Sequence, residues 1–123
     1  MYADKDYYNT NYGKITDENN LNVALRNASR HIDILTYNRI VGEGVSSLTP
    51  FQLEVVKNVC CELADFEMEN KDLIDSVLSQ YSINGTSMSF ATSGNMKIVS
   101  GVVIPSSLYT YLRTTGLCNR NIR

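Results

Sequence analysis

The sequence predicts a mainly α protein, a small helical bundle with a short antiparallel β-hairpin or sheet inserted before the last helix. Apolar residues recur at helical spacing between residues 21 and 35, a helix-start signal stands at Thr49-Pro50, and apolar and polar residues alternate within 81–104. The chain has 123 residues, 43% of them hydrophobic and 20% charged, which suits one domain with a modest core. We therefore expect a single domain, 1–123, with an N-terminal arm (1–15) and a C-terminal tail (117–123).

The N-terminal arm is rich in tyrosine and shows neither helical nor strand periodicity. Its tyrosines, set among Asn, Asp and Thr, are Tyr2, Tyr7, Tyr8 and Tyr12. A tyrosine has an apolar ring and a polar hydroxyl group. Such a segment can therefore pack over a neighbouring surface while its hydroxyl groups stay exposed to solvent. The arm either folds onto its own domain or reaches another subunit.

The first long helix is predicted to begin at Thr16 or Asp17. Its core stripe follows a 3-4-3 pattern through Leu21, Ala24, Leu25, Ala28, Ile32 and Leu35. A second, thinner apolar stripe contains Val23 and Ile34, with Asn27 and His31 between the two stripes. A helix with two apolar faces is either sandwiched inside its own fold or contacts another protein.

A flexible connection over Val41–Ser47 separates this helix from the next. The second helix has Thr49 as N-cap, Pro50 at its first position and Gln52 completing a capping box. It runs to about Glu69 as the central buried helix, with the apolar set Phe51, Leu53, Val55, Val56, Val59, Cys60, Leu63 and Phe66. Its remaining polar edge is predicted to be solvated and consists of Glu54, Asn58, Glu62, Asp65 and Glu69.

A short helix, Lys71–Leu78, follows a break near Asn70. Strands are then predicted within 81–104, without a fixed register, from Ile98–Ile104 and from the alternating residues Tyr81, Ile83, Met88 and Phe90. A last helix begins after Pro105 with an apolar side formed by Leu108 and Leu112, and it stops at Gly116-Leu117.

The residues offer no constellation typical of an enzyme. The single histidine, His31, is expected to be packed or at the rim of the core, and no nucleophile-elbow, zinc-protease, phosphate-loop or dinucleotide-binding motif occurs. We expect no cofactor and no metal, since the acids at 62, 65 and 69 share one helix face and metal sites rarely rely on one helix alone. The sequence favours a binding or assembly module.

Composition limits the kinds of partner that we expect for this chain and indicates the cellular compartment in which it works. A formal charge of −2 is too balanced for a dedicated nucleic-acid binder, and no apolar stretch is long enough to span a membrane. The three cysteines form no CxxC pair, which favours a reducing cytoplasm. Cys60 is expected in the core, whereas Cys61 points away from it and can touch a neighbouring molecule.

The order of segments resembles the small head-tail connector (adaptor) proteins of tailed bacteriophages and prophages. The resemblance is carried by the stretch Ala28–Ile40, by Thr49-Pro50-Phe51-Gln52, and by the shorter matches Tyr81-Ser82-Ile83, Ile104-Pro105 and Thr115-Gly116-Leu117. It implies a helical-bundle protein that forms a ring, expected to be a dodecamer, beneath the portal. Such a ring extends the DNA channel and presents a docking surface to a stopper, neck or tail protein. No catalytic residue is carried over.

This resemblance places the protein at the head-tail junction of a virion, and in the host cytoplasm during assembly. The expected portal contacts are Arg113, Leu117, Arg120 and Arg123, since the C-terminal segment of similar adaptors engages the portal. The expected subunit-interface residues are Val23, Asn27, Ile34, Tyr7 and Tyr8. The expected channel lining is Glu62, Asp65 and Glu69, whose negative charge would let DNA pass without sequence-specific binding.

Three alternatives stay open. The chain can be a stopper or tail-completion protein of the same neck. It can be a small helical nucleic-acid-binding regulator that uses Arg26, Arg30 and Arg39. An enzyme that depends on His31 is the most distant alternative.

Overall fold

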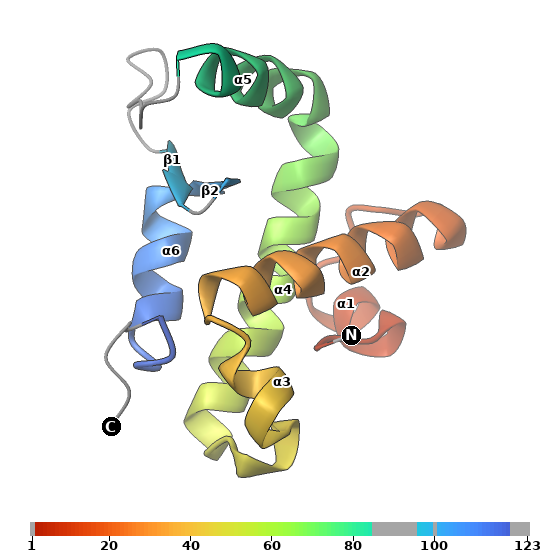
Figure 1. Ribbon diagram of the computed structural model, residues 1–123. Coiled ribbons are helices and arrows are strands. Elements are labelled where there is room, and N and C mark those ends of the chain that lie inside the picture. Colours follow the sequence, from red (N-terminus) through yellow and green to blue (C-terminus); the bar gives the residue numbers. More distant parts are fainter. Residues whose placement is uncertain (1, 85–95, 100, 119–123) are drawn as a thin grey trace.

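The computed structural model describes residues 2–84, 96–99 and 101–118. The prediction of a mainly α protein with a β-hairpin before the last helix is confirmed (Figure 1). The helices are α1 (Lys5–Asn11), α2 (Glu18–Leu35), α3 (Arg39–Glu43), the 3₁₀ turn η1 (Val45–Ser47), α4 (Pro50–Glu69), α5 (Lys71–Asn84) and α6 (Ser106–Arg113). The strands are β1 (Met96–Val99) and β2 (Val102–Pro105).

Helix α4 is the centre of the fold, with α2 crossing it and α6 packed along another side (Figure 1). Its start is fixed by the predicted capping box. The Thr49 hydroxyl accepts from the Gln52 N–H at 3.1 Å, and the Gln52 side chain accepts from the Thr49 N–H at 3.0 Å. The buried residues that follow include Val55, Val56, Val59, Cys60 and Leu63.

Phe51 does not belong to this core, contrary to the sequence prediction. Its side chain is 56% exposed. The first turn of α4 lies beside α3 at the end of the molecule (Figure 1), beyond the part of the helix that α2 crosses, so its apolar ring has little of the core to pack on.

Helix α2 buries its predicted core stripe from Leu21 to Leu35 against the rest of the fold. Asp17 caps the helix by accepting from the Asn19 N–H at 3.0 Å. The second stripe stays outside, with Val23 52% and Ile34 39% exposed. The described part of the chain therefore does not sandwich α2.

Two segments predicted as irregular contain short helices. The N-terminal arm forms α1, because the Asp4 carboxylate accepts from the Tyr7 N–H at 2.8 Å and starts a helical turn. The predicted flexible connection Val41–Ser47 overlaps α3 and η1. Gly44 stands between them with φ of +88°, a conformation that glycine adopts without strain.

Helix α5 continues to Asn84, so the strand predicted to begin at Tyr81 is wrong. Ile74, Val77, Leu78 and Tyr81 keep the helical 3-1-3 spacing, which the apparent alternation around residue 81 concealed. The predicted strand residues Met88 and Phe90 lie outside the described residues.

The hairpin is short and is buried on both faces. It pairs Met96 with Pro105 and Val99 with Val102 in antiparallel register. Val102 and Ile104 join the main core, whereas Met96 and Val103 face the other way and form a second cluster with Val77 of α5. The hairpin thus ties α5 to the main core.

The two stripes of α2 should differ sharply in their contribution to stability. We expect Leu25→Ala to lower the free energy of unfolding by about 2–5 kcal/mol, because it removes a fully buried side chain. Val23→Ala, on the exposed stripe, should change it by no more than about 0.5 kcal/mol. Urea denaturation followed by circular dichroism measures both, and equal losses would show that the second stripe is also core.

Candidate interaction surfaces

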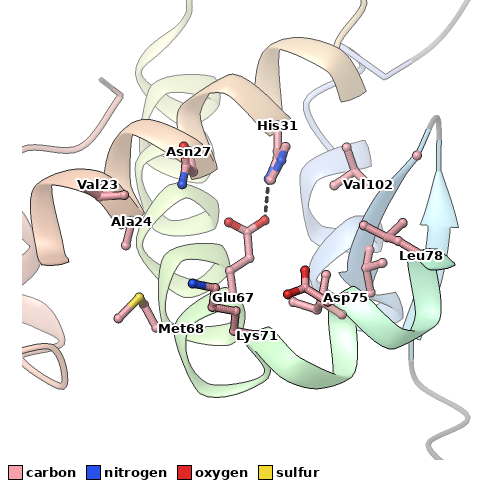
Figure 2. A pocket seen from close by; sticks show the side chains of 13 residues that line it. Val23, Ala24, Asn27, His31, Glu67, Met68, Lys71, Asp75, Leu78 and Val102 are labelled. Atoms are coloured by element: carbon pink, nitrogen blue, oxygen red, sulfur yellow. Dashed lines mark hydrogen bonds and ion pairs between the residues drawn. The ribbon is translucent and has the colours of Figure 1, made fainter.

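An open groove lies where α2, the α4–α5 junction and the β-hairpin meet (Figure 2). Val23, Ala24, Asn27 and His31 line it from α2, and the hairpin contributes Gly101, Val102 and Val103. The α4–α5 junction supplies Glu67, Met68, Lys71, Ile74, Asp75 and Leu78. We call this the α2–α5 groove.

One polar pair crosses the groove. The His31 Nδ1 atom is hydrogen-bonded to the Glu67 carboxylate (Figure 2). The His31 side chain is 33% exposed and the Glu67 side chain is 16% exposed. This agrees with the prediction of a rim histidine. The pair joins α2 to the end of α4, and the imidazole has no nucleophile among its described partners.

The groove combines exposed apolar side chains with polar ones. Its volume is about 280 Å³, close to the lower end of the roughly 300–1,000 Å³ of small-molecule pockets. Val23 and Met68, at 52% and 39% exposed, present apolar surface to solvent there. Clustered exposed apolar surface beside polar groups is typical of a protein contact.

Three further exposed apolar residues lie on segments at the opposite end of α4. Val41 of α3, Val45 of η1 and Phe51 of α4 are 62%, 46% and 56% exposed, and these three segments lie together at one end of the molecule (Figure 1). We call these three residues the apolar tip. Residue 51 and Met68 are separated by about 25 Å along the helix, at roughly 1.5 Å per residue.

The N-terminal tyrosines cover the polar edge of α4. Tyr8 donates its hydroxyl hydrogen to the Asp65 carboxylate, and Tyr7 donates to the Asn58 side chain. Tyr12 donates to Glu62 at 3.2 Å. Positions 58, 62 and 65 share one face of the helix. The sequence suggested separate partners for the tyrosines of the arm and for the polar edge of α4, but in the structure they bind each other.

The same packing removes three residues from the surface. Tyr8, predicted at a subunit interface, is 0% exposed, and Asp65, predicted to line a channel, is 6% exposed. Cys61, expected to touch a neighbouring molecule, is 0% exposed. These three predictions are wrong because the arm folds onto its own domain and covers that side of α4.

The other predicted contact residues lie on the surface or beyond the described residues. Val23 and Asn27 line the α2–α5 groove, and Ile34 is exposed on the same helix. Tyr7 is half-buried, and Glu62 and Glu69 are exposed on α4. Arg113 is exposed and Leu117 is half-buried, whereas Arg120 and Arg123 lie outside the described residues.

The arginines of the regulator alternative are not equivalent. Arg26 and Arg30 are exposed on α2. The Arg39 guanidinium instead donates to the Gly116 carbonyl at 3.3 Å and lies 5.9 Å from the centre of the Tyr37 ring. Arg39 therefore holds the turn after α6 in place.

In the described parts of the chain, no group of three or more His, Cys, Asp or Glu side chains is placed to hold a metal ion. No described helix has the length and apolar character needed to cross a membrane.

Sequence reasoning missed the groove and the tip. Glu67, Met68 and Lys71 meet Val23 only through the crossing of α2 over α4, which no local pattern reveals. Comparisons with protein-family models, with curated proteins and with solved structures gave no match.

The tyrosine contacts predict loss of stability at alkaline pH. Burial, and then the hydrogen bond to Asp65, raises the pKa of Tyr8 from 10.0 to about 12. Burial also raises the pKa of Tyr2 and Tyr12, which lie beside Asp33 and Glu62. A raised folded-state pKa means that the stabilisation is complete below pH 10 and is lost as the pH rises towards 12.

Tyr8→Phe tests this expectation. The variant should be less stable at pH 8 by about 1–3 kcal/mol, because Asp65 loses its buried donor. Between pH 10 and 12 its free energy of unfolding should fall less steeply than that of the wild type, by up to about 1.4 kcal/mol per pH unit. Urea denaturation across this range measures both effects, with Tyr37→Phe, at an exposed tyrosine, as control; equal slopes would contradict the assignment.

Burial of Cys61 beneath the arm predicts slow alkylation. Burial raises the pKa of this thiol to about 12, with Cys60 and Asp65 adding to the shift. Tyr8→Ala should open the arm and raise the rate at which iodoacetamide labels Cys61 on the order of 100-fold. Peptide mass spectrometry follows the label, and Cys118, near the other terminus, is the internal control. Equal acceleration at both cysteines would indicate global unfolding and contradict a local cover.

Proposed function

We propose that this chain is a structural subunit of the neck of a tailed bacteriophage. It assembles as a ring, expected to be a dodecamer, beneath the portal, extends the DNA channel and joins the head to the neck or tail. The observation that carries the proposal is the presence of two unlike exposed apolar surfaces, the α2–α5 groove and the apolar tip, at opposite ends of α4. A closed ring needs such a pair, because its head-to-tail contacts join two different surfaces of each copy.

The charge distribution supports a channel through which DNA slides. Glu62 and Glu69 remain exposed on α4, where Lys14 pairs with Glu69 at 3.7 Å and Tyr12 donates to Glu62, and Asp72 and Asp75 are exposed on α5. A wall of such carboxylates repels phosphates, which is the opposite of a binding groove. With Asp65 buried, the proposed channel lining is reduced to Glu62 and Glu69.

The C-terminal end is the proposed portal contact. Arg113 is exposed at the end of α6, and its guanidinium lies 5.9 Å from the centre of the Tyr109 ring. Leu117 follows the turn that Gln52 and Arg39 hold through the carbonyls of Thr115 and Gly116. This anchored turn would present Arg113 and Leu117 to a portal; Arg120 and Arg123, which lie outside the described residues, stay proposed portal contacts from the sequence alone.

Affinity capture of the tagged full chain from the cells that produce it tests the proposal. We expect mass spectrometry to identify a portal-sized ring protein together with neck or tail components. Tail components without a portal would place the chain lower in the neck, as a stopper or tail-completion protein. Nucleic acid or metabolic enzymes without any virion component would overturn the proposal.

A charge reversal in the captured chain tests the portal contact itself. Arg113→Glu should reduce recovery of the portal by about tenfold or more, since interface arginines are frequent energetic anchors. Arg26→Glu, at an exposed arginine on α2, is the matched control and should leave recovery unchanged. Unchanged recovery with Arg113→Glu would rule out this residue, and salt-dependent DNA binding lost in Arg26→Glu would favour the regulator.

A further inference from the structure

Three cations lie against tyrosine rings near the C-terminal end of α6. They are Lys97 of β1, Arg113 of α6 and Arg39 at the start of α3. Lys97 and Arg113 both lie over the Tyr109 ring, at 5.8 and 5.9 Å from its centre. Arg39 lies 5.9 Å from the centre of the Tyr37 ring. We call these three cations and two rings the basic patch.

The two halves of the basic patch are joined through the turn after α6. The Arg39 guanidinium donates to the Gly116 carbonyl at 3.3 Å, three residues after Arg113. Burial raises the pKa of the Cys118 thiol to about 11, and the positive charges of Arg113 and Arg39 both oppose this rise. Both guanidinium groups therefore lie close to the same thiol, and the three cations belong to one surface.

The charge of the basic patch is not neutralised within the described residues. No carboxylate there pairs with Lys97, Arg39 or Arg113. The chain has no Asp or Glu after Asp75, and none within 34–42. The acceptors of Arg39 are carbonyl groups, which satisfy N–H donors without cancelling the charge. Its Nε atom is buried without an acceptor among the described residues.

The helix ends do not supply the missing negative charge. Arg113 stands in the last turn of α6, where the C-terminus of the helix carries about half an elementary negative charge. This offsets part of one cation and leaves Lys97, which faces the same ring from β1. Two cations held against one ring repel each other, so an anion that contacts both would be bound favourably.

We infer that the basic patch binds an acidic segment of a partner protein through the carboxylates of its Asp or Glu side chains. A guanidinium can hold a carboxylate with two parallel N–H donors, and the carboxylate supplies the negative charge that the patch lacks. The inference rests on the proposed function, because Arg113 belongs to the proposed portal contact. It adds the chemistry that the portal would present there.

The tyrosines favour an acidic protein segment over a nucleic acid. Proteins that bind single strands combine phosphate contacts with aromatic faces on which bases stack. Tyr109 is half-buried and has two cations over its ring, and Arg39 lies over Tyr37. These rings hold cations in place. The formal charge of −2 also repels a long polyanion, whereas a short acidic segment contacts the patch alone.

Binding of a fluorescein-labelled hexaglutamate peptide to the full chain, followed by fluorescence anisotropy, tests the inference. We expect saturable binding at about 50 mM salt that weakens as salt is added, because exposed charges are screened. Unlabelled hexaglutamine, which carries no side-chain charge, should not compete. Arg113→Gln should weaken binding about tenfold, since it removes a charged donor. Arg26→Gln, at an exposed arginine on α2, is the matched control and should bind like the wild type.

The ring between the two cations gives a second test. Tyr109→Phe keeps the ring and should bind hexaglutamate like the wild type. Tyr109→Leu removes the ring and should weaken binding about threefold, because Lys97 and Arg113 lose the contact that positions them. Circular dichroism confirms that each variant is folded. Equal binding by the two variants would contradict a patch organised by this ring.

The outcomes separate this inference from the proposed function. Absence of saturable hexaglutamate binding, or equal weakening by Arg113→Gln and Arg26→Gln, would overturn the inference. Binding of an oligothymidylate of matched charge as tightly as hexaglutamate would also overturn it, in favour of a nucleic acid. Recovery of a portal by affinity capture would leave the proposed function standing in each case. Hexaglutamate binding that depends on Arg113, without any virion component in the capture, would retain the inference and overturn the neck assignment.

Discussion

The hydrogen bond between Tyr8 and the buried Asp65 is the constraint on which the surface of this molecule depends. A carboxylate with 6% exposure is costly to bury unless donors satisfy it. Asp65 lies on α4 at the edge of the core, so its donor has to come from a segment that covers that edge. The N-terminal arm supplies it, and the Ile15 N–H in turn donates to the Tyr8 hydroxyl at 2.7 Å. This buried acid thus holds Tyr8 and Ile15 against α4, and contacts of Tyr2 with α2 and of Tyr12 with α4 complete the path of the arm.

Because the N-terminal arm covers the polar edge of α4, a partner can contact this helix only elsewhere. Helix α4 is flanked by α2, by α6 and by the N-terminal arm, so little of its length between the two ends is open. Apolar side chains that are not needed for the core are left at those ends, where Phe51 and Met68 are exposed. The exposed apolar side chains of α4 that can meet a partner are therefore those near its two ends.

The sequence predicted local features well and the meeting of distant segments poorly. The capping box at Thr49, the core stripe of α2 and the hairpin before the last helix all have short-range signals, and all are present. Phe51 was misplaced because a helical pattern does not show where the covering helices end. Asp65 was misplaced because an acid on a polar edge looks the same whether water or a tyrosine faces it. The Cys61 error has the same origin, since no pattern within α4 reveals the arm that folds over it.

The small size of the exposed apolar surfaces has a consequence for the proposed ring. The groove holds about 280 Å³ and only three exposed apolar residues form the tip, so a contact through either surface is small, and interfaces well below roughly 1,000 Å² are usually weak. In a closed ring every copy makes this contact twice, so a copy leaves only when both contacts break. The second contact is intramolecular once the ring is closed, and it benefits from a high effective concentration. A free chain would then be mainly monomeric, and a template that gathers copies would convert the same weak contact into a stable ring. A portal is such a template, because its own symmetry would hold the C-terminal ends of neighbouring copies at fixed spacing.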